Sequence, residues 1–309
     1  MQKITVNGQR PGPHLLITAG VHGDEYEPME AVRRLINLLK GDRLTLSRGS
    51  VSLVPVVNEP AFQMASRYGP DGLDLARVCP GDASGSITMQ IAAQVSELIK
   101  SSDYYIDMHG GGHLYDISPF AGYVLHQDQD IRQIQRTMAR AFNFPMVWGT
   151  DPNLPGRTLS VARDAAVPGI YTEYGGGVLY RDYITKACME GCLNVMKSLG
   201  FIEEPFEGDT VEYHIEDHRP KSGFLQHMMP SPKTGFFLPQ VTLGQSVQPG
   251  DTVGLIKDVT GGDNTIIEAD QPGKFFLMRS VPSVHQGDSL GGILHLVKNK
   301  SIVVIDDHE

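Results

Sequence analysis

The sequence predicts an α/β domain followed by an all-β domain. In the first two thirds of the 309-residue chain, short apolar runs alternate with longer segments whose apolar residues recur at helical spacing. Such alternation is typical of an α/β layer architecture. After residues 203–205 (EEP) the pattern changes to short apolar runs between Gly- and Pro-rich turns, without a convincing helix. At about 150 residues per domain, the length also fits two domains, which we place at 1–205 and 206–309.

The elements of the first domain follow from their local patterns. Strands are expected where apolar residues run together, at 14–19, 51–57, 104–108 and 167–172. Helices are expected where apolar residues fall three or four apart, at 28–40, 87–100, 130–142 and 181–199, the last closed by Gly200. In open α/β sheets, ligands bind just beyond the carboxyl ends of strands, so motifs at these points are the first candidates for function.

The C-terminal part carries a weak internal repeat. The pattern V-x-x-G-D-x-x-G-x-I begins at Val247 and recurs 37 residues later, at Val284. Two similar β units often pair into a small sandwich or barrel, and these turns resemble those of biotinyl and lipoyl carrier domains. Carrier domains need an attachment lysine between their halves, where this chain has 268–271 (EADQ), so we expect a biotinyl/lipoyl-type barrel without the prosthetic group. A hairpin that recurs by chance is the simpler alternative.

The composition of the chain argues against some classes of binding partner. The chain has 26 basic and 36 acidic residues, a net charge of −10, so phosphate backbones and anionic lipids would repel it. No apolar run approaches the roughly 20 residues that span a bilayer, and residues 1–14 lack the apolar stretch of a signal peptide. We therefore expect a cytoplasmic protein that binds neither nucleic acid nor membrane. A homo-oligomer is compatible with the sequence, which leaves the oligomeric state open.

Two strand-end motifs carry residues that can bind a metal. In 20–25 (GVHGDE), His22 and Glu25 lie three residues apart, directly after an expected strand. In 105–111 (YIDMHGG), His109 ends another strand, and Asp107 points to the same side of that strand, where it could orient a metal-bound imidazole. A catalytic zinc takes three protein ligands, typically His and Glu, and keeps one position open for water. His113 in the same glycine loop competes with His109, which we favour because the strand holds it more rigidly.

The order of the motifs resembles one enzyme family. G-x-H-G-x-E at 20–25 is followed by N-x-x-A-F at 58–62, Arg67, D-L-x-R-x-x-P-G at 74–81, D-x-H-G at 107–110 and TEYGG at 172–176. This order resembles the succinylglutamate desuccinylase/aspartoacylase family, a branch of the zinc carboxypeptidase-like hydrolases, from about residue 14 to about 177. The resemblance implies a mixed sheet flanked by helices. It also implies one zinc ion per chain with His22, Glu25 and His109 as ligands, and Glu173 as the general base.

The resemblance assigns further roles to arginines. Arg67 matches an arginine that helps polarise the scissile carbonyl, and Arg77 matches the arginine of an Asn-Arg pair that binds the substrate carboxylate. The sequence departs from the family at the Asn position, which is Ala76, so one hydrogen bond to a dicarboxylic substrate should be missing. The family also has an arginine upstream of the catalytic Glu, for which Arg157 and Arg163 both remain candidates.

Taken together, these residues predict a zinc-dependent amidohydrolase that removes an acyl group from an N-acylated amino acid or similar small amide. Amide hydrolysis needs a nucleophile, carbonyl polarisation and a proton route to the leaving amine. A metal-activated water, Arg67 and Glu173 would supply these three. One alternative is a metallocarboxypeptidase that cuts peptide ends, since Arg77 would serve either substrate. A second alternative is a non-catalytic relative that binds a small carboxylated ligand, which the replacement at Ala76 would permit.

Overall fold

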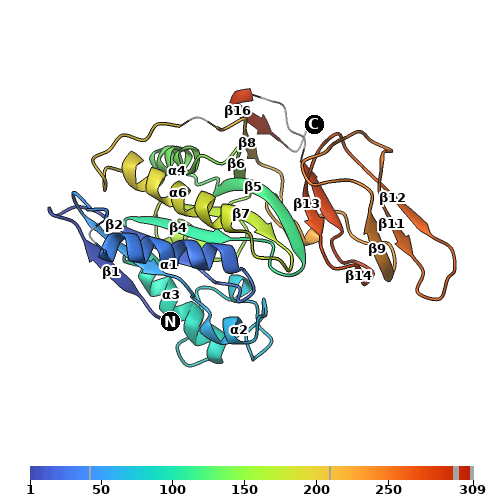
Figure 1. Cartoon of the computed structure of the whole chain (residues 1–309), viewed down its shortest axis with the longest axis horizontal. Coiled ribbons are helices and arrows are strands. Elements are labelled where there is room, and N and C mark those ends of the chain that lie inside the picture. Colours follow the sequence, from blue (N-terminus) through green and yellow to red (C-terminus); the bar gives the residue numbers. More distant parts are fainter. Residues whose placement is uncertain (42, 209, 295–298, 307–309) are drawn as a thin grey trace.

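The computed structural model describes residues 1–41, 43–208, 210–294 and 299–306 of the chain. Its centre is a mixed sheet in which the strands follow the order β1-β3-β2-β4-β7-β5-β6-β8-β16 (Figure 1). Neighbours are parallel except for the β1–β3 and β5–β7 pairs. The strand bounds are β1 Ile4–Asn7, β2 His14–Ala19, β3 Ser50–Val54, β4 Tyr104–His109, β5 Tyr115–Val124, β6 Met146–Thr150, β7 Gly169–Gly176, β8 Tyr213–Asp217 and β16 Asn299–Ile305.

Helices cover both faces of this sheet, as the sequence predicts. One apolar core joins the sheet to α1 (Tyr26–Lys40), α4 (Gln129–Phe142) and α6 (Asp182–Ser198), which lie together in front of the sheet in Figure 1. A second core joins the opposite face to α3 (Ile87–Lys100) and α5 (Thr158–Asp164). The short α2 (Glu59–Gln63) follows β3, beyond its carboxyl end. The result is a three-layer α/β architecture.

All eight elements expected in the first domain are found, several with differences at their ends. Helix α3 spans the expected 87–100, whereas α1 begins two residues earlier than expected and β3 ends three residues earlier. The expected strand at 167–172 is β7, which continues through Gly176 because it pairs with β5 in antiparallel fashion. Glu173 therefore lies within a strand and not after its end. The sequence pattern did not predict β5, whose run of apolar residues is interrupted by Pro119, or β6.

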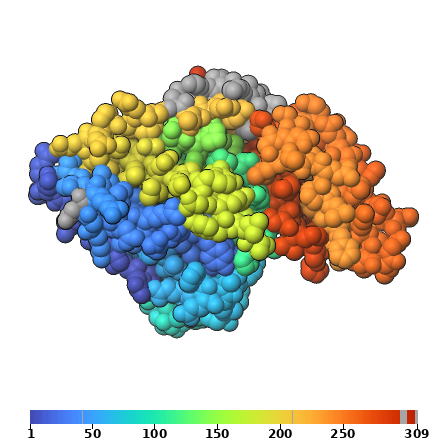
Figure 2. Space-filling model, in the orientation of Figure 1, coloured from blue at the N-terminus to red at the C-terminus, as the bar shows by residue number. Residues whose placement is uncertain are grey.

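The C-terminal part forms a β-rich lobe beside the large sheet, which projects to the right in Figures 1 and 2. One four-stranded sheet has the order β12-β11-β9-β14. The other layer centres on β13, which pairs with β10, β15 and also β5 of the large sheet, so the lobe is joined to the α/β part by backbone hydrogen bonds. The bounds are β9 Gly235–Pro239, β10 Ser246–Val247, β11 Thr252–Lys257, β12 Thr265–Glu268, β13 Gly273–Arg279, β14 Ser283–Val284 and β15 Gly291–Leu294.

The sequence repeat corresponds to two turns of the same geometry. In the first turn Asp251 accepts a hydrogen bond from the backbone N–H of Gln248 at 2.8 Å, and in the second Asp288 accepts one from His285 at 3.0 Å. Gly250 and Gly287 both adopt φ near +90°, the left-handed region that glycine occupies without strain. Each turn connects a strand that leaves one layer to a strand that enters the other.

Residues after 206 also extend the large sheet. Strand β8 pairs in parallel with β6, and β16 pairs with β8 at the edge of the sheet. The C-terminal third of the chain therefore contributes strands to both parts of the molecule. Among the described residues, the structure contains no helix with the length and apolarity needed to cross a membrane.

Candidate metal centre and active site

The candidate site lies at the carboxyl ends of the parallel strands β2, β4 and β7. His22 and Glu25 follow β2 in the turn that leads into α1, and His109 is the last residue of β4. Glu173 on β7 is the register partner of His109 on β4, so their side chains leave the same face of the sheet. These four residues, separated by up to 151 positions in the chain, line one cavity.

His22, Glu25 and His109 converge on one point. The Oε1 atom of Glu25 lies 2.6 Å from Nδ1 of His22, and its Oε2 atom lies 3.0 Å from Nδ1 of His109. One ligand atom from each side chain lies within 4.8 Å of the other two, and all three residues are buried. Glu25 is the N-cap residue of α1 but makes no capping hydrogen bond with its side chain, which leaves its carboxylate available to the two imidazoles.

Two further carboxylates fix the orientation of the imidazole rings. Nε2 of His109 lies 3.1 Å from Asp107, and Nε2 of His22 lies 3.2 Å from Asp74. If each ring donates its Nε2–H to its neighbouring aspartate, the lone pairs of both Nδ1 atoms face the Glu25 carboxylate. Two neutral imidazoles and one carboxylate, oriented by outer carboxylates, are a donor set that suits a catalytic divalent cation. The residues present therefore fit a zinc ion.

The structure favours His109 over His113 as the third candidate metal ligand. His113 does not line the cavity, and its ring packs 6.0 Å from that of Tyr26. Its backbone N–H donates to Asp24 at 2.9 Å, which fixes the glycine loop. The position of Asp107 beside His109 agrees with the expectation that both lie on one side of their strand. Burial lowers the pKa of His109, but the carboxylates of Asp107 and Glu25 outweigh it and raise that pKa well above its usual range.

Glu173 is a half-buried residue, and one of its carboxylate oxygens has no protein partner among the described residues. Its Oε2 atom is buried and has no hydrogen-bond partner among the described residues. Burial raises the pKa of Glu173 to about 8; His109 opposes the rise, and the Glu25 carboxylate adds to it. Within the described part of the chain, Glu173 forms no ion pair with an arginine, so a purely structural pairing does not explain its burial. An unpaired oxygen beside the candidate metal-binding triad is suited to accept a proton.

Arg67 lies beside the candidate metal-binding residues and is held by Asp74. Two of its guanidinium nitrogens contact Oδ2 of Asp74 at 3.0 and 2.9 Å, and its Nη1 lies 3.4 Å from Nδ1 of His22. Its side chain is 18% exposed and lines the cavity. Asp74 thus fixes both an expected ligand and an expected carbonyl-polarising cation, a role that its place in the D-L-x-R motif did not reveal.

Arg77 and Arg157 bring two more positive charges to the cavity, and Arg163 does not. Arg163 lies outside the cavity, where it contacts Asp164 and the carbonyl of Pro152. Burial lowers the pKa of Arg77 to about 10; Asp74 opposes the shift, and Arg157 and Arg67 add to it. Among the described residues, neither Arg77 nor Arg157 pairs directly with a carboxylate. Two half-buried cations without anionic partners create a site for an anionic ligand group.

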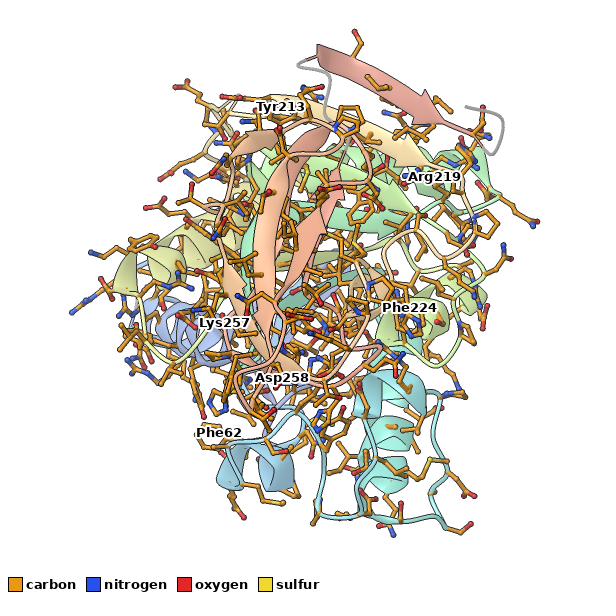
Figure 3. All side chains as sticks on the ribbon, turned by 90° about the vertical axis from the view of Figure 1, so that its right-hand side faces the viewer. Phe62, Tyr213, Arg219, Phe224, Lys257 and Asp258 are labelled. Atoms are coloured by element: carbon orange, nitrogen blue, oxygen red, sulfur yellow. The ribbon has the colours of Figure 1, made fainter. Side chains whose placement is uncertain are left out.

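A C-terminal segment that sequence reasoning missed covers these arginines. The carbonyl of Gly223 accepts a hydrogen bond from Arg157 at 3.4 Å, and the side chain of Gln226 accepts one from Arg77 at 3.0 Å. Phe224, labelled in Figure 3, presents its ring to both guanidinium groups, with Cζ atoms 4.9 and 5.3 Å from the ring centroid. No local motif marks residues 223–226, because their role depends on contacts with residues about 70 to 150 positions earlier.

The arrangement combines three capabilities in one cavity. A cation-binding triad faces a carboxylate that can accept a proton, a fixed guanidinium lies next to the triad, and two further arginines lie on the same cavity wall. Together the three features suit hydrolysis of a carbonyl compound that also carries a carboxylate. Ala76 is buried in this wall next to Arg77 and offers only its backbone carbonyl, which accepts a hydrogen bond from Arg77 at 2.7 Å.

Known proteins are similar to this chain in sequence and in fold. Residues 11–199 match the succinylglutamate desuccinylase/aspartoacylase catalytic domain. Over 308 residues the chain is 31% identical to N-alpha-acetyl-L-2,4-diaminobutyric acid deacetylase from Halomonas elongata, an alignment that covers 97% of this chain and 87% of the relative. A succinylglutamate desuccinylase/aspartoacylase from Rhodobacter sphaeroides has a TM-score of 0.83 at 27% identity, over 97% of this chain and 89% of that one. The product-bound ectoine utilization protein from Ruegeria pomeroyi shares the fold, with a TM-score of 0.83 at 24% identity, over 94% and 87% of the two chains.

Proposed function

The chain belongs to the succinylglutamate desuccinylase/aspartoacylase family, and from this premise we propose that it is a zinc-dependent amidohydrolase that removes an acyl group from an N-acylated amino acid or similar small amide. The observation that carries the proposal is the convergence of His22, Glu25 and His109 within 4.8 Å, beside the unpartnered Oε2 of Glu173. The diaminobutyrate relative is named as a deacetylase of an N-acetyl amino acid, which supports the same class of substrate here.

The proposed metal is zinc, held by His22, Glu25 and His109. When bound there, zinc lowers the pKa of a coordinated water and polarises a carbonyl oxygen. Asp107 and Asp74 keep the two imidazoles in the tautomer and orientation that expose Nδ1.

Glu173 is the proposed general base. Its free Oε2 accepts a proton from the attacking water and returns that proton to the nitrogen of the leaving amine. The position of Glu173 on β7, one strand away from His109, brings this oxygen to the same edge of the sheet as the ligands. The neighbouring Gly175 and Gly176 both have positive φ, and a Cβ on either would lie within 2.5 Å of Ile184 or Tyr115, so glycine there permits close packing around this part of β7.

The proposed substrate contacts divide between two groups of arginines. Arg67 donates hydrogen bonds to the oxygen that becomes negative when the carbonyl is attacked, an effect whose loss typically costs about 3–4 kcal/mol. Arg77 and Arg157 bind the carboxylate of the amino-acid part, since both are half-buried cations that lack a direct carboxylate partner among the described residues. Residues 223–226 cover this wall of the cavity, which favours a small substrate over a long peptide.

We also propose that residues 1–205 form the catalytic domain and that residues 206–309 form a β-rich C-terminal domain resembling a biotinyl/lipoyl-type barrel without a prosthetic group. The two equivalent Asp turns and the alternation of their strands between two layers support this likeness. Strands β8 and β16 of the second domain complete the sheet of the first.

A hydrolysis screen tests the proposed function. Zinc-reconstituted protein is incubated with N-acetyl, N-formyl and N-succinyl amino acids and with peptides that have a free C-terminus, and release of free amine is measured. We expect turnover of N-acyl amino acids and none of the peptides. Cleavage of peptides alone would indicate a carboxypeptidase. Tight binding without turnover of any compound would indicate a non-catalytic relative.

A further inference from the structure

Arg77 and Arg157 lie on the cavity wall that we propose binds the substrate carboxylate. One neighbour of Arg77 on this wall has no polar side-chain group, and another has one. Ala76 has no polar side-chain atom beside Arg77, whereas Gln226 reaches Arg77 from the C-terminal segment. We propose that Gln226 supplies the second hydrogen-bond donor to the substrate carboxylate, so that the carboxylate is held between Arg77 and the side-chain amide of Gln226. This inference rests on the proposed function and assigns a specificity-determining residue to it.

The chemistry of the Arg77–Gln226 contact fixes the orientation of the amide. A guanidinium group only donates hydrogen bonds, so the oxygen of Gln226 must face Nη2 of Arg77, as it does at 3.0 Å. The Nε2 group of Gln226, which carries two hydrogens, is then turned away from the arginine. Among the described residues, no atom accepts a hydrogen bond from this Nε2. Gln226 lines the cavity, so the free donor and the Arg77 cation belong to one wall.

Neighbouring contacts hold Gln226 in place. Residues Leu225–His227 form a short 3₁₀ helix. Its first residue, Leu225, is buried in the core shared by β5, β6, β8 and β13. The carbonyl of Leu225 also accepts a hydrogen bond from Ser289 at 3.3 Å. On the other side of Leu225, the Phe224 ring stacks against Arg77 and Arg157. Because its neighbour Leu225 is buried, Gln226 loses little conformational freedom when a ligand binds.

This arrangement has a consequence for substrate choice. A carboxylate accepts hydrogen bonds from both Arg77 and Gln226, whereas a carboxamide in its place presents an N–H₂ group and can satisfy only part of the site. A neutral donor to a charged acceptor typically changes affinity by about 10- to 100-fold. We therefore expect preference for substrates with a free carboxylate, and expect that preference to depend on Gln226.

The test compares Gln226→Leu with the parent on an N-acetyl amino acid and its carboxamide analogue. We expect KM for the acid to rise about 10- to 100-fold in the variant, kcat to stay within a few-fold, and the preference for acid over carboxamide to shrink. Adding Ala76→Asn to Gln226→Leu should restore part of the preference by supplying a donor from the opposite side. Gln248→Leu, which changes an exposed turn of the β-rich lobe, is the matched control and should leave all values at the parent level.

A binding measurement separates this inference from the proposed function. Calorimetry with the acid and the carboxamide is repeated in a Glu173→Gln background, where the ligands are not consumed. Weaker binding of the acid in Gln226→Leu with unchanged binding of the carboxamide supports the inference, even if the parent shows no turnover. Equal affinity for the acid in parent and variant overturns it, even if the parent is an active deacylase.

Discussion

His109 and Glu173 are register partners on adjacent parallel strands, β4 and β7, and the backbone pairing of those strands fixes the distance between a proposed metal ligand and the proposed base. Because neighbouring strands lie about 4.8 Å apart, the two side chains project from nearly the same point of the sheet edge. The pairing explains how residues 64 positions apart in the chain can act on one substrate.

Removal of His109 should abolish metal binding without unfolding the protein. His109→Ala loses one of three ligands at a centre that supports catalysis and not the fold, so zinc content after dialysis should fall to a small fraction of the parent value. His113→Ala, in the same loop but outside the cavity, is the control and should retain zinc. Elemental analysis measures the metal and circular dichroism the fold. Full zinc occupancy in His109→Ala would contradict the proposed ligand set.

Loss of the Asp107 carboxylate should weaken the metal site more mildly. Asp107→Asn keeps the size of the side chain but removes the charge that orients His109 through a 3.1 Å contact. Outer carboxylates of this kind typically contribute about 10- to 100-fold in metal affinity or activity. Competition with a chromophoric chelator should show a zinc Kd raised by about that factor. An unchanged Kd would mean that Asp107 has no role at the metal.

Substitution of Glu173 should affect turnover and leave binding intact. Glu173→Gln keeps the shape and removes the proton acceptor, so kcat should fall by at least about 100-fold, the lower end for general-base catalysis. Zinc content and substrate affinity should remain at the parent level, because the proton transfer occurs in the transition state. Glu190→Gln, an exposed change on α6, is the matched control. A lower melting temperature with kcat within a few-fold of the parent would assign Glu173 a structural role.

Truncation of the carboxylate-binding arginines should raise KM. Arg77→Ala and Arg157→Ala each remove charge-assisted hydrogen bonds to the substrate in both ground and transition states, which predicts a rise in KM of about 10- to 100-fold with a smaller change in kcat. Arg163→Ala serves as the control because Arg163 lies outside the cavity. Steady-state kinetics on one N-acetyl amino acid tests all three variants. A KM for Arg77→Ala equal to that for Arg163→Ala would refute the assignment.

His214, remote from the site, should make stability depend on pH. Burial lowers the pKa of His214 to about 4, helped by Arg140 and opposed by Glu216. The unfolded chain, with a pKa near 6.5, binds a proton that the folded protein excludes, so stability is lost as pH falls from about 6.5 to about 4. The free energy of unfolding lost through His214 over this pH range is about 3 kcal/mol at most.

A non-titrating variant isolates this contribution. His214→Gln keeps a polar group near the hydroxyl of Tyr123 but cannot titrate, so the drop in unfolding free energy between pH 7 and pH 4.5 should be smaller than in the parent. His285→Gln removes a histidine whose side chain is 80% exposed and should preserve the parental drop. Urea unfolding at both pH values measures the difference, and equal drops in parent and His214→Gln would show that His214 is not the cause.

The sequence by itself determined the elements and residues that depend on neighbours in the chain. Apolar spacing predicted α3 and β2 at their observed bounds, because burial of one face of an element imposes a local period. The short spacing of His22 and Glu25 after a strand, and of Asp107 and His109 within one, likewise placed these pairs on common sides. Their position at strand ends indicated the edge of the sheet where the site is found.

The tertiary structure alone decided which distant residues meet. The choice of Arg157 over Arg163, the double contact of Asp74 with His22 and Arg67, and the approach of Gln226 to Arg77 all depend on how loops pack across the cavity. So do the antiparallel pairing that extends β7 through Glu173, and the return of β8 and β16 to the large sheet. The local periodicity of the sequence does not predict these contacts, because each arises from strand pairing and core packing between segments far apart in the sequence.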